Sequence, residues 1–213
     1  MTESSSAESW AFSKAASKPE TQRLGMLSLS EPERNSLLKL TREAVMEAVS
    51  RGRILSYIPA DGVFAEKVGV FVTLHVRGRL GGCVGVIEPH EPLGEAIVRC
   101  AVSAALQDPR FSPMRPEDLP HLHIEISLLS APIPIRHEDI EIGRHGLLVS
   151  RGQQRGLLLP QVAVEHHLTP EQFISETCRK AQLPSDAWRW PDVELQGFTC
   201  EVVSEPQSNR QKH

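Results

Sequence analysis

The chain has 213 residues, 40% of them hydrophobic and 23% charged, which is typical of one globular domain with room for a smaller lobe. Its net charge of −4 and its aromatic content of 5% disfavour nucleic acid as a partner, because surfaces that bind nucleic acid are rich in Lys and Arg. No stretch approaches the roughly 20 apolar residues that cross a bilayer, so no membrane partner is expected.

The pattern of the chain predicts two tails and a central domain. Residues 1–27 are rich in Ser, Ala, Glu and Lys without sustained periodicity, and they are predicted to form a mobile N-terminal tail. The polar residues 206–213 are predicted to form a C-terminal tail. Residues 28–205 then form the domain, with a smaller lobe at about 131–165.

The first helix of the domain is predicted from its start signal. Ser30-Glu31-Pro32-Glu33 has the pattern of a capping box with proline in the first turn, and apolar residues then recur at helical spacing up to Gly52. Residues 53–67 are predicted as a loop, with turn signals at Pro59 and Asp61-Gly62.

A β-hairpin is predicted between Val70 and Ile87, with its turn at Arg77-Gly78-Arg79. Alternate side chains on a strand point to opposite faces. Strict alternation predicts two faces on the second strand: Leu80, Gly82, Val84 and Val86 on one, and Gly81, Cys83, Gly85 and Ile87 on the other.

Cys83 is therefore expected between two glycines, Gly81 and Gly85, on its own face of the strand. Glycine weakens a strand interior by roughly 0.5–1 kcal/mol relative to alanine, so a cluster of glycines needs a reason. There are two possible reasons: either another element packs closely against the surface left bare by the glycines, or a ligand lies on that surface with the thiol exposed to it. The residues alone leave both explanations open.

A second helix is predicted to begin at Pro92 and to carry a narrow stripe of small apolar side chains that includes Cys100. It ends by Asp108, because the residue before Pro109 avoids the helical region. Asp108-Pro-Arg110-Phe111 then forms a rigid corner. Either Asp108 and Arg110 form a local ion pair, or Arg110 presents its donors to a carboxylate or phosphate ligand.

Residues His121 to Leu129 alternate as an antiparallel strand does, with His121, His123, Glu125 and Ser127 on one face. Two histidines and a glutamate at this spacing have the donor types of a metal site. A solvated outer face of the strand explains the same residues more simply.

Two short apolar segments, 140–149 and 155–161, are each approached through glycine and predict a second hairpin in the smaller lobe. His145 is expected at a turn between Arg144 and Gly146, where its ring either faces solvent or makes a structural hydrogen bond, or faces a cleft. Thr169-Pro-Glu-Gln172 is a second capping box, which predicts a helix that buries Cys178, and residues 196–203 form a last strand.

The cysteines and the N-terminus indicate a cytoplasmic protein. Cys83, Cys100, Cys178 and Cys200 are scattered without a Cys-x-x-Cys pair, which fits reduced thiols better than a disulfide framework or a zinc ribbon. Met1-Thr-Glu-Ser lacks a basic start followed by an apolar stretch, so no secretory signal is expected.

Several of these segments together resemble the AMMECR domain, also called AmmeMemoRadiSam system protein A. The resemblance covers roughly residues 30–203 and rests on six motifs that occur in the same order: Gly69-Val-Phe-Val-Thr-Leu, Leu80-Gly-Gly-Cys-Val-Gly, Asp108-Pro-Arg-Phe, Ile124-Glu-Ile-Ser-Leu-Leu, Gly143-Arg-His-Gly-Leu and Gly156-Leu-Leu-Leu-Pro-Gln-Val-Ala. It implies an α/β (α+β) fold with a mainly antiparallel sheet, flanking helices and a small lobe.

The resemblance also implies partners, because the prokaryotic members are associated with a Memo-like protein and a radical S-adenosylmethionine protein. It does not establish an activity or name a cofactor. Members of the family usually have the sequence Leu-Arg-Gly-Cys-Ile-Gly at this position, and this chain has Gly81 in place of the arginine. A cation beside a thiol favours the thiolate, so its loss puts a catalytic role of Cys83 in doubt unless Arg79 substitutes for it.

Two functions from different classes follow as hypotheses. In the first, the chain is a component of a multiprotein enzyme system and acts on a small polar substrate in a cleft around Cys83. The catalytic candidates are then Cys83 and His145, the substrate-binding candidates are Gly82, Gly85, Asp108, Arg110 and Glu125, and no metal ligand is assigned. In the alternative, the same cleft belongs to a non-catalytic interaction module that binds a partner protein or a small ligand.

Overall fold

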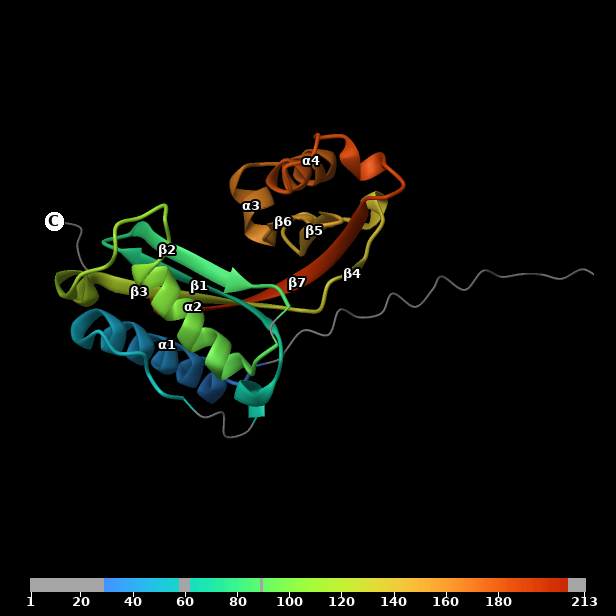
Figure 1. Ribbon diagram of the computed structural model, residues 1–213. Helices are drawn as coiled ribbons and strands as arrows, with labels where there is room; N and C mark the ends of the chain where they lie inside the picture. The colour runs from blue at the N-terminus through green and yellow to red at the C-terminus, as the bar shows by residue number, and fades with distance from the viewer. Residues whose placement is uncertain (1–28, 58–61, 89, 207–213) are drawn as a thin grey trace, which may run out of the picture.

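The computed structural model describes residues 29–57, 62–88 and 90–206, so almost all of both predicted tails lies outside the described residues. Its centre is a curled antiparallel sheet in the order β2-β1-β3-β7-β5-β6, with the short β4 paired to β7 (Figure 1). The strands are β1 (Gly69–Val76), β2 (Arg79–Val86), β3 (Leu122–Leu129), β4 (Ile133–Pro134), β5 (His145–Arg151), β6 (Gln154–Leu158) and β7 (Glu194–Ser204). The helices are α1 (Glu31–Arg51), α2 (Leu93–Leu106), α3 (Pro160–Glu165) and α4 (Pro170–Lys180).

In the first lobe, α1 and α2 lie side by side against one face of β2-β1-β3 (Figure 1). The predicted capping box starts α1, since Glu33 accepts a hydrogen bond from the main-chain N–H of Ser30 at 2.8 Å, and Gly52 ends it with a φ of 63°. The buried side of the sheet is formed by Val70, Val72, Leu74, Ile124, Ile126 and Leu128. We call this the helix face of the sheet.

The second lobe has its own hydrophobic cluster under α4, which packs on β5 and β6. The predicted hairpin and the predicted capping box of Thr169 and Gln172 are confirmed. The cluster draws on residues as far apart as Ile135 and Leu195, so it extends beyond the segment 131–165 of the predicted smaller lobe. Part of the second predicted strand is wrong, because Pro160 starts the short helix α3.

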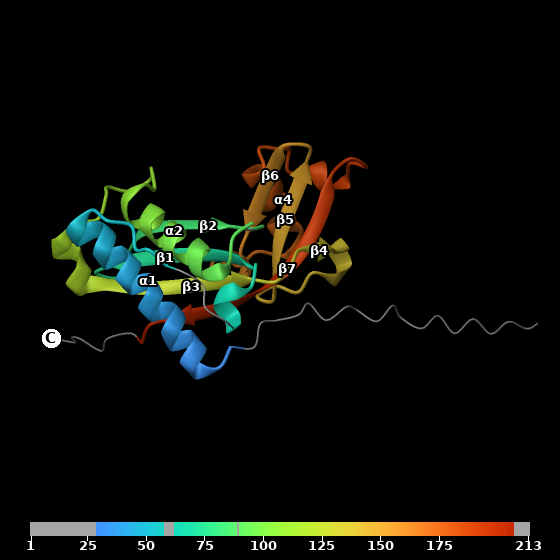
Figure 2. The same ribbon diagram turned by 60° about the horizontal axis from the view of Figure 1, so that its bottom comes forward.

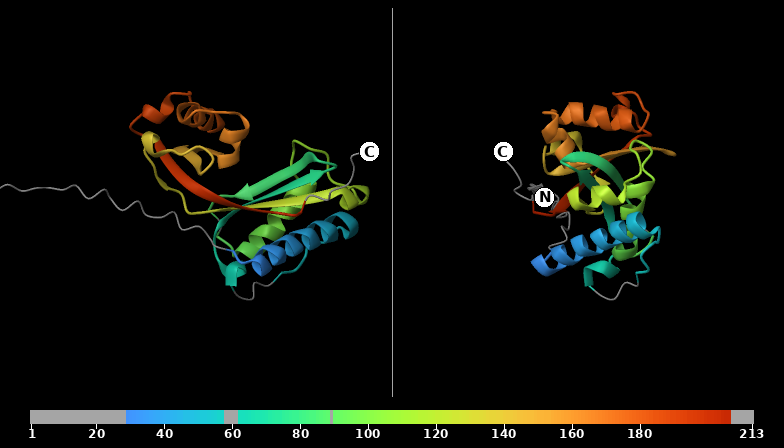
Figure 3. Two further views of the ribbon diagram at one scale, coloured as in Figure 1. Left: turned by 180° about the vertical axis from the view of Figure 1, so that it is seen from behind. Right: turned by 90° about the vertical axis from the view of Figure 1, so that its left-hand side faces the viewer.

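The long strand β7 joins the two lobes, pairing with β3 at its C-terminal end and with β5 at its N-terminal end. Figures 2 and 3 show it running from one lobe into the other, while β5 and β6 stand steeply to β1–β3. An ion pair of 3.4 Å between Arg155 on β6 and Glu88 just after β2 connects the two outer strands of the curled sheet.

The first hairpin is confirmed, but its pattern of faces differs from strict alternation. Its turn is Arg77-Gly78, both with positive φ, and Leu74 pairs with Gly82 while His75 pairs with Leu80. Gly81 is thus the extra residue of a β-bulge, which reverses the alternation before it. The prediction that Leu80 shares a face with Gly82 is therefore wrong.

The same bulge corrects two further expectations. Arg79 pairs with Val76, and Val76 points to the helix face because it lies two residues after Leu74 on β1. Arg79 therefore lies on the face opposite Cys83. A Cβ on Gly81 would meet Val76 Cγ2 at 3.4 Å, which places this position next to a side chain of the helix face. The predicted placement of Gly81 on the face of Cys83 therefore fails as well.

Candidate functional site

Cys83 lies on the face of the sheet opposite α1 and α2. The register pairs it with Thr73, and Thr73 in turn with Glu125, so three strands contribute one row of side chains, Cys83–Thr73–Glu125. The Thr73 hydroxyl donates a hydrogen bond to Cys83 Sγ over 3.3 Å and fixes the position of the sulfur. We call this side of the sheet the thiol face. All three residues of the row are half-buried.

The exposure of Cys83 sets it apart from two of the other cysteines. Cys100 and Cys178 have no exposed surface, as the helical stripes predict, and Cys200 is half-buried on β7. Burial raises the pKa of Cys100 and of Cys200 to about 11, and it also raises the pKa of Cys178. Burial thus makes the thiolate form of these three cysteines less accessible, which lowers their reactivity.

The main chain of Cys83 is held from the side by the corner after α2. Because β2 is an edge strand, the N–H and C=O of Cys83 that point away from β1 need partners. Asp108 Oδ2 accepts from the N–H at 2.9 Å, and Arg110 Nη2 donates to the C=O at 2.8 Å. The two side chains form a clasp around one residue of the edge strand.

The clasp is also an ion pair, so the structure favours the local interpretation of the corner. Arg110 donates to Asp108 through Nε at 2.9 Å and through Nη2 at 2.7 Å. These bonds hold the pKa of the buried Asp108 carboxyl far below its usual range and raise the pKa of Arg110. The Arg110 guanidinium lies over Phe111 at 5.3 Å from the ring centroid and is half exposed. No acceptor for its Nη1 lies among the described residues.

Packing explains the two glycines of β2 that were assigned to substrate. A Cβ on Gly82 would lie 2.0 Å from the main-chain oxygen of Ala104, so this glycine lets α2 approach the strand. A Cβ on Gly85 would lie 2.3 Å from the ring of Phe71, which covers the glycine on the thiol face. The surface beside Cys83 that the glycines were expected to leave bare is thus covered at Gly85 by the ring of Phe71.

His145 is not brought together with Cys83. His145 lies two residues before Leu147 on β5, so both side chains point to the same face, and Leu147 belongs to the hydrophobic cluster under α4. Its Nδ1 accepts a hydrogen bond of 3.0 Å from the main-chain N–H of Glu141, and burial lowers its pKa. This geometry matches the local hydrogen-bonded alternative for His145 and gives no support to a base for the thiol.

His123 on β3 and the other candidate metal ligands around it also lack the arrangement of a metal site, and His121 lies just before the strand. His123 Nε2 lies 2.8 Å from the main-chain oxygen of Glu205, and its ring is 6.2 Å from the ring of His75. Within residues 29–57, 62–88 and 90–206, no three His, Cys, Asp or Glu side chains are arranged to hold a metal ion. The half-buried Glu125 remains beside Thr73, in the row of Cys83.

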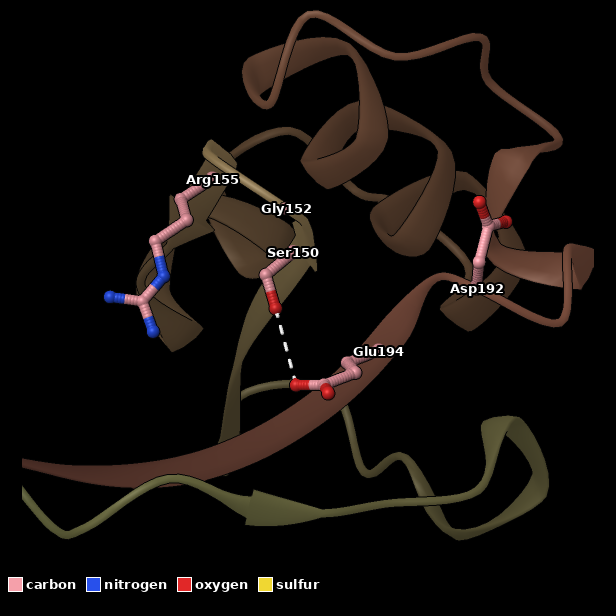
Figure 4. Close-up of a pocket in the computed structure, with 5 residues that line it drawn as sticks. All are labelled: Ser150, Gly152, Arg155, Asp192 and Glu194. Carbon is pink, nitrogen blue, oxygen red and sulfur yellow. Dashed lines mark hydrogen bonds between the residues drawn. The ribbon is translucent and has the colours of Figure 1, made fainter.

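A pocket of about 410 Å³ in the second lobe was not predicted from the sequence. Its lining is polar and comes from the β5-β6 hairpin with its turn, from β7 and from the segment just before β7 (Figure 4): Ser150, Gly152, Arg155, Asp192 and Glu194. These residues are 44 positions apart at the extremes and meet only through the pairing of β5 with β6 and β7. Thr73 was missed for the same reason, because its bond to Cys83 depends on strand register.

Comparison with known proteins agrees with the fold and the motifs. The AMMECR1 family model matches residues 38–203. A protein of Thermococcus gammatolerans is 43% identical over 182 residues, covering 79% of this chain and 88% of that protein. Protein MK0488 of Methanopyrus kandleri is 43% identical over 189 residues, covering 84% of this chain and 90% of that protein.

A solved structure shares the architecture. The crystal structure of the uncharacterized protein PH0010 from Pyrococcus horikoshii matches with a TM-score of 0.73 at 38% identity, covering 80% of this chain and 90% of that one. The curled antiparallel sheet with flanking helices is thus the α+β fold that the motifs implied. The chain belongs to the AMMECR1 family. Of the helices in the described part of the chain, none has both the length and the hydropathy to cross a bilayer.

Proposed function

We propose that the chain is a cytoplasmic component of a multiprotein enzyme system and that the thiol face around Cys83 binds a small polar substrate. The observation that carries the proposal is the placement of Cys83: the residue is half-buried on the face opposite α1 and α2, while its main chain is clasped by Asp108 and Arg110. A thiol held at both its main chain and its sulfur is preorganised for contact with a ligand.

The roles within the proposed site follow from the row of side chains. Cys83 contacts the substrate, Thr73 orients the sulfur, and Glu125 offers a carboxylate to a polar or cationic group. The half-exposed Arg110 stands at the edge of β2 with donors available to an anionic group. The proposed partners are a Memo-like protein and a radical S-adenosylmethionine protein, as the family resemblance implies.

A non-catalytic interaction module is the second candidate. Two exposed large apolar side chains lie on the thiol face by register: Leu80, opposite His75, is 43% exposed, and Val202, opposite Ser127, is 41% exposed. Apolar surface beside a polar row is typical of a site that binds a segment of a partner protein. In this case the thiol would contribute contact area only.

Affinity purification of the tagged chain from its own organism tests the proposal, with mass spectrometry of bound proteins and bound metabolites. We expect the system proteins with the wild type and with Cys83→Ser, and a small polar compound with the wild type only. Cys200→Ser is the matched control, because it removes a second half-buried thiol without touching the clasp. It should retain both classes of partner.

The two candidates separate in the same experiment. Loss of the compound in Cys83→Ser, with retention of the proteins, supports the substrate site. Retention of all partners in Cys83→Ser and Cys83→Ala, together with loss of the proteins in Leu80→Asp, would favour the interaction module. Purification of the wild type with neither a protein nor a compound would overturn both.

A further inference from the structure

The pocket of the second lobe has two poles of opposite charge. The register pairs Ser150 with Arg155 on one side and with Glu194 on the other, so the three side chains form a row across β6, β5 and β7 (Figure 4). Arg155 and Glu194 are thus held on either side of a strand, with main chains about 10 Å apart. The buried Ser150 lies between them and its hydroxyl points to Glu194, at 3.5 Å from Oε2.

Arg155 and Glu194, the positive and the negative pole of the pocket, each keep hydrogen-bonding positions that a ligand can use. Asp192 is neutralised by Arg151, whose Nε lies 2.8 Å from Oδ2. Arg155 uses Nη2 for the 3.4 Å contact with Glu88, and no acceptor for its Nε or Nη1 lies among the described residues. For Glu194, the Ser150 hydroxyl is the one hydrogen-bond donor that the described residues supply.

Charge decides which ligand such a pocket accepts. A simple anion at Arg155 would be repelled by Glu194, and a simple cation at Glu194 would be repelled by Arg155. A molecule with a carboxylate and an ammonium group satisfies both poles, because Arg is suited to carboxylates and Glu accepts from ammonium groups. The volume of about 410 Å³ lies in the range of about 300–1,000 Å³ of small-molecule sites.

We propose that this pocket binds a free α-amino acid, with its carboxylate at Arg155, its ammonium group at Glu194 and the Ser150 hydroxyl between them. The site is separate from the one proposed around Cys83, since none of its lining residues belongs to the Cys83–Thr73–Glu125 row. The pocket belongs to the second lobe, and the proposal does not depend on the role of Cys83.

Binding to the full-length chain tests the proposal, by calorimetry with the proteinogenic L-amino acids at millimolar concentration. The best binder is then compared with its N-acetyl derivative, which keeps only the carboxylate, and with its amide, which keeps only the ammonium group. We expect each half-charged analogue to bind at least about tenfold more weakly, as does the parent amino acid with Arg155→Gln and with Glu194→Gln.

Two controls make the outcome specific. Arg179→Gln removes an exposed arginine of the same lobe, outside the pocket, and should leave binding unchanged. Unfolding curves of each variant confirm that the exposed substitutions leave the fold intact. Absence of binding by all amino acids, equal binding of the N-acetyl derivative, or an effect of Arg179→Gln as large as that of Arg155→Gln would each overturn the proposal.

Discussion

The main-chain N–H of Cys83 lies 2.9 Å from Oδ2 of Asp108, so an acid just beyond α2 holds the edge strand at the residue that carries the thiol. The two residues are 25 positions apart, and the contact exists because α2 packs back onto β2. Position and orientation of Cys83 thus depend on a carboxylate that does not itself reach the sulfur.

Asp108→Asn should lower the free energy of unfolding by about 1–3 kcal/mol, because a buried acceptor of charge-assisted hydrogen bonds is replaced by a neutral one. Urea denaturation gives the value. Glu141→Gln is the control, since it removes the carboxylate of an exposed pair with Arg144 and should change the free energy by less than about 1 kcal/mol. Equal effects of the two substitutions would refute the role of the clasp.

Asp108 should also make stability depend on acid pH. Its pKa in the folded protein is lowered from 3.8, so the unfolded state binds more protons and the free energy of unfolding rises with pH in this range. The contribution is complete above the unfolded pKa and is lost as the pH falls through the folded value. The stability difference between wild type and Asp108→Asn should hold steady near neutrality and shrink below about pH 5. A difference that grows on acidification would contradict this assignment.

Of the two adjacent glycines of β2, Gly82 should not tolerate a side chain and Gly81 should. Gly82→Ala forces a Cβ to within 2.0 Å of the Ala104 oxygen and should cost at least about 1–3 kcal/mol as α2 shifts. Gly81→Arg, which introduces the residue usual in the family, meets its nearest neighbour at 3.4 Å and should change stability by less than about 0.5 kcal/mol. Thermal unfolding of both variants decides, and tolerance of Gly82→Ala would disprove the close approach of α2.

Cys83 should react with iodoacetamide before the other three cysteines of the native chain. It is half-buried, whereas Cys100 and Cys178 have no exposed surface and burial raises the pKa of Cys200 to about 11. Peptide mass spectrometry over a time course gives the four rates, and the urea-unfolded chain, in which all four should react together, is the control. Protection of Cys83 equal to that of Cys100 would remove the thiol from the proposed site.

Much of the fold could be predicted because its signals are local. The capping boxes at Ser30 and Thr169 each act over three residues, and both start helices where predicted. The alternation of residues 122–129 placed Ile124 and Ile126 in the core. Helix α3 was missed because its six residues are too few for a helical period to be seen in the sequence.

The candidate site was predicted only in part. The sequence identified Cys83, Asp108 and Arg110 as chemically relevant, and the structure joins them through main-chain bonds of Cys83. The glycine pattern was misleading only at the start of β2, because the unpaired residue Gly81 reverses the faces that strict alternation assigns to Leu80 and to Gly81 itself. His145 has the right chemistry for a base, yet its side of the sheet depends on a register that no local pattern encodes.

The sequence by itself determined the helices with strong caps, the two hairpins, the antiparallel class and the family, because turn chemistry, side-chain period and motif order are all properties of neighbouring residues. The tertiary structure decided the clasp on Cys83, the row with Thr73 and the charged pocket around Ser150. Each of these needs residues far apart in the chain to meet in one register, and that register is selected by the packing of the whole sheet.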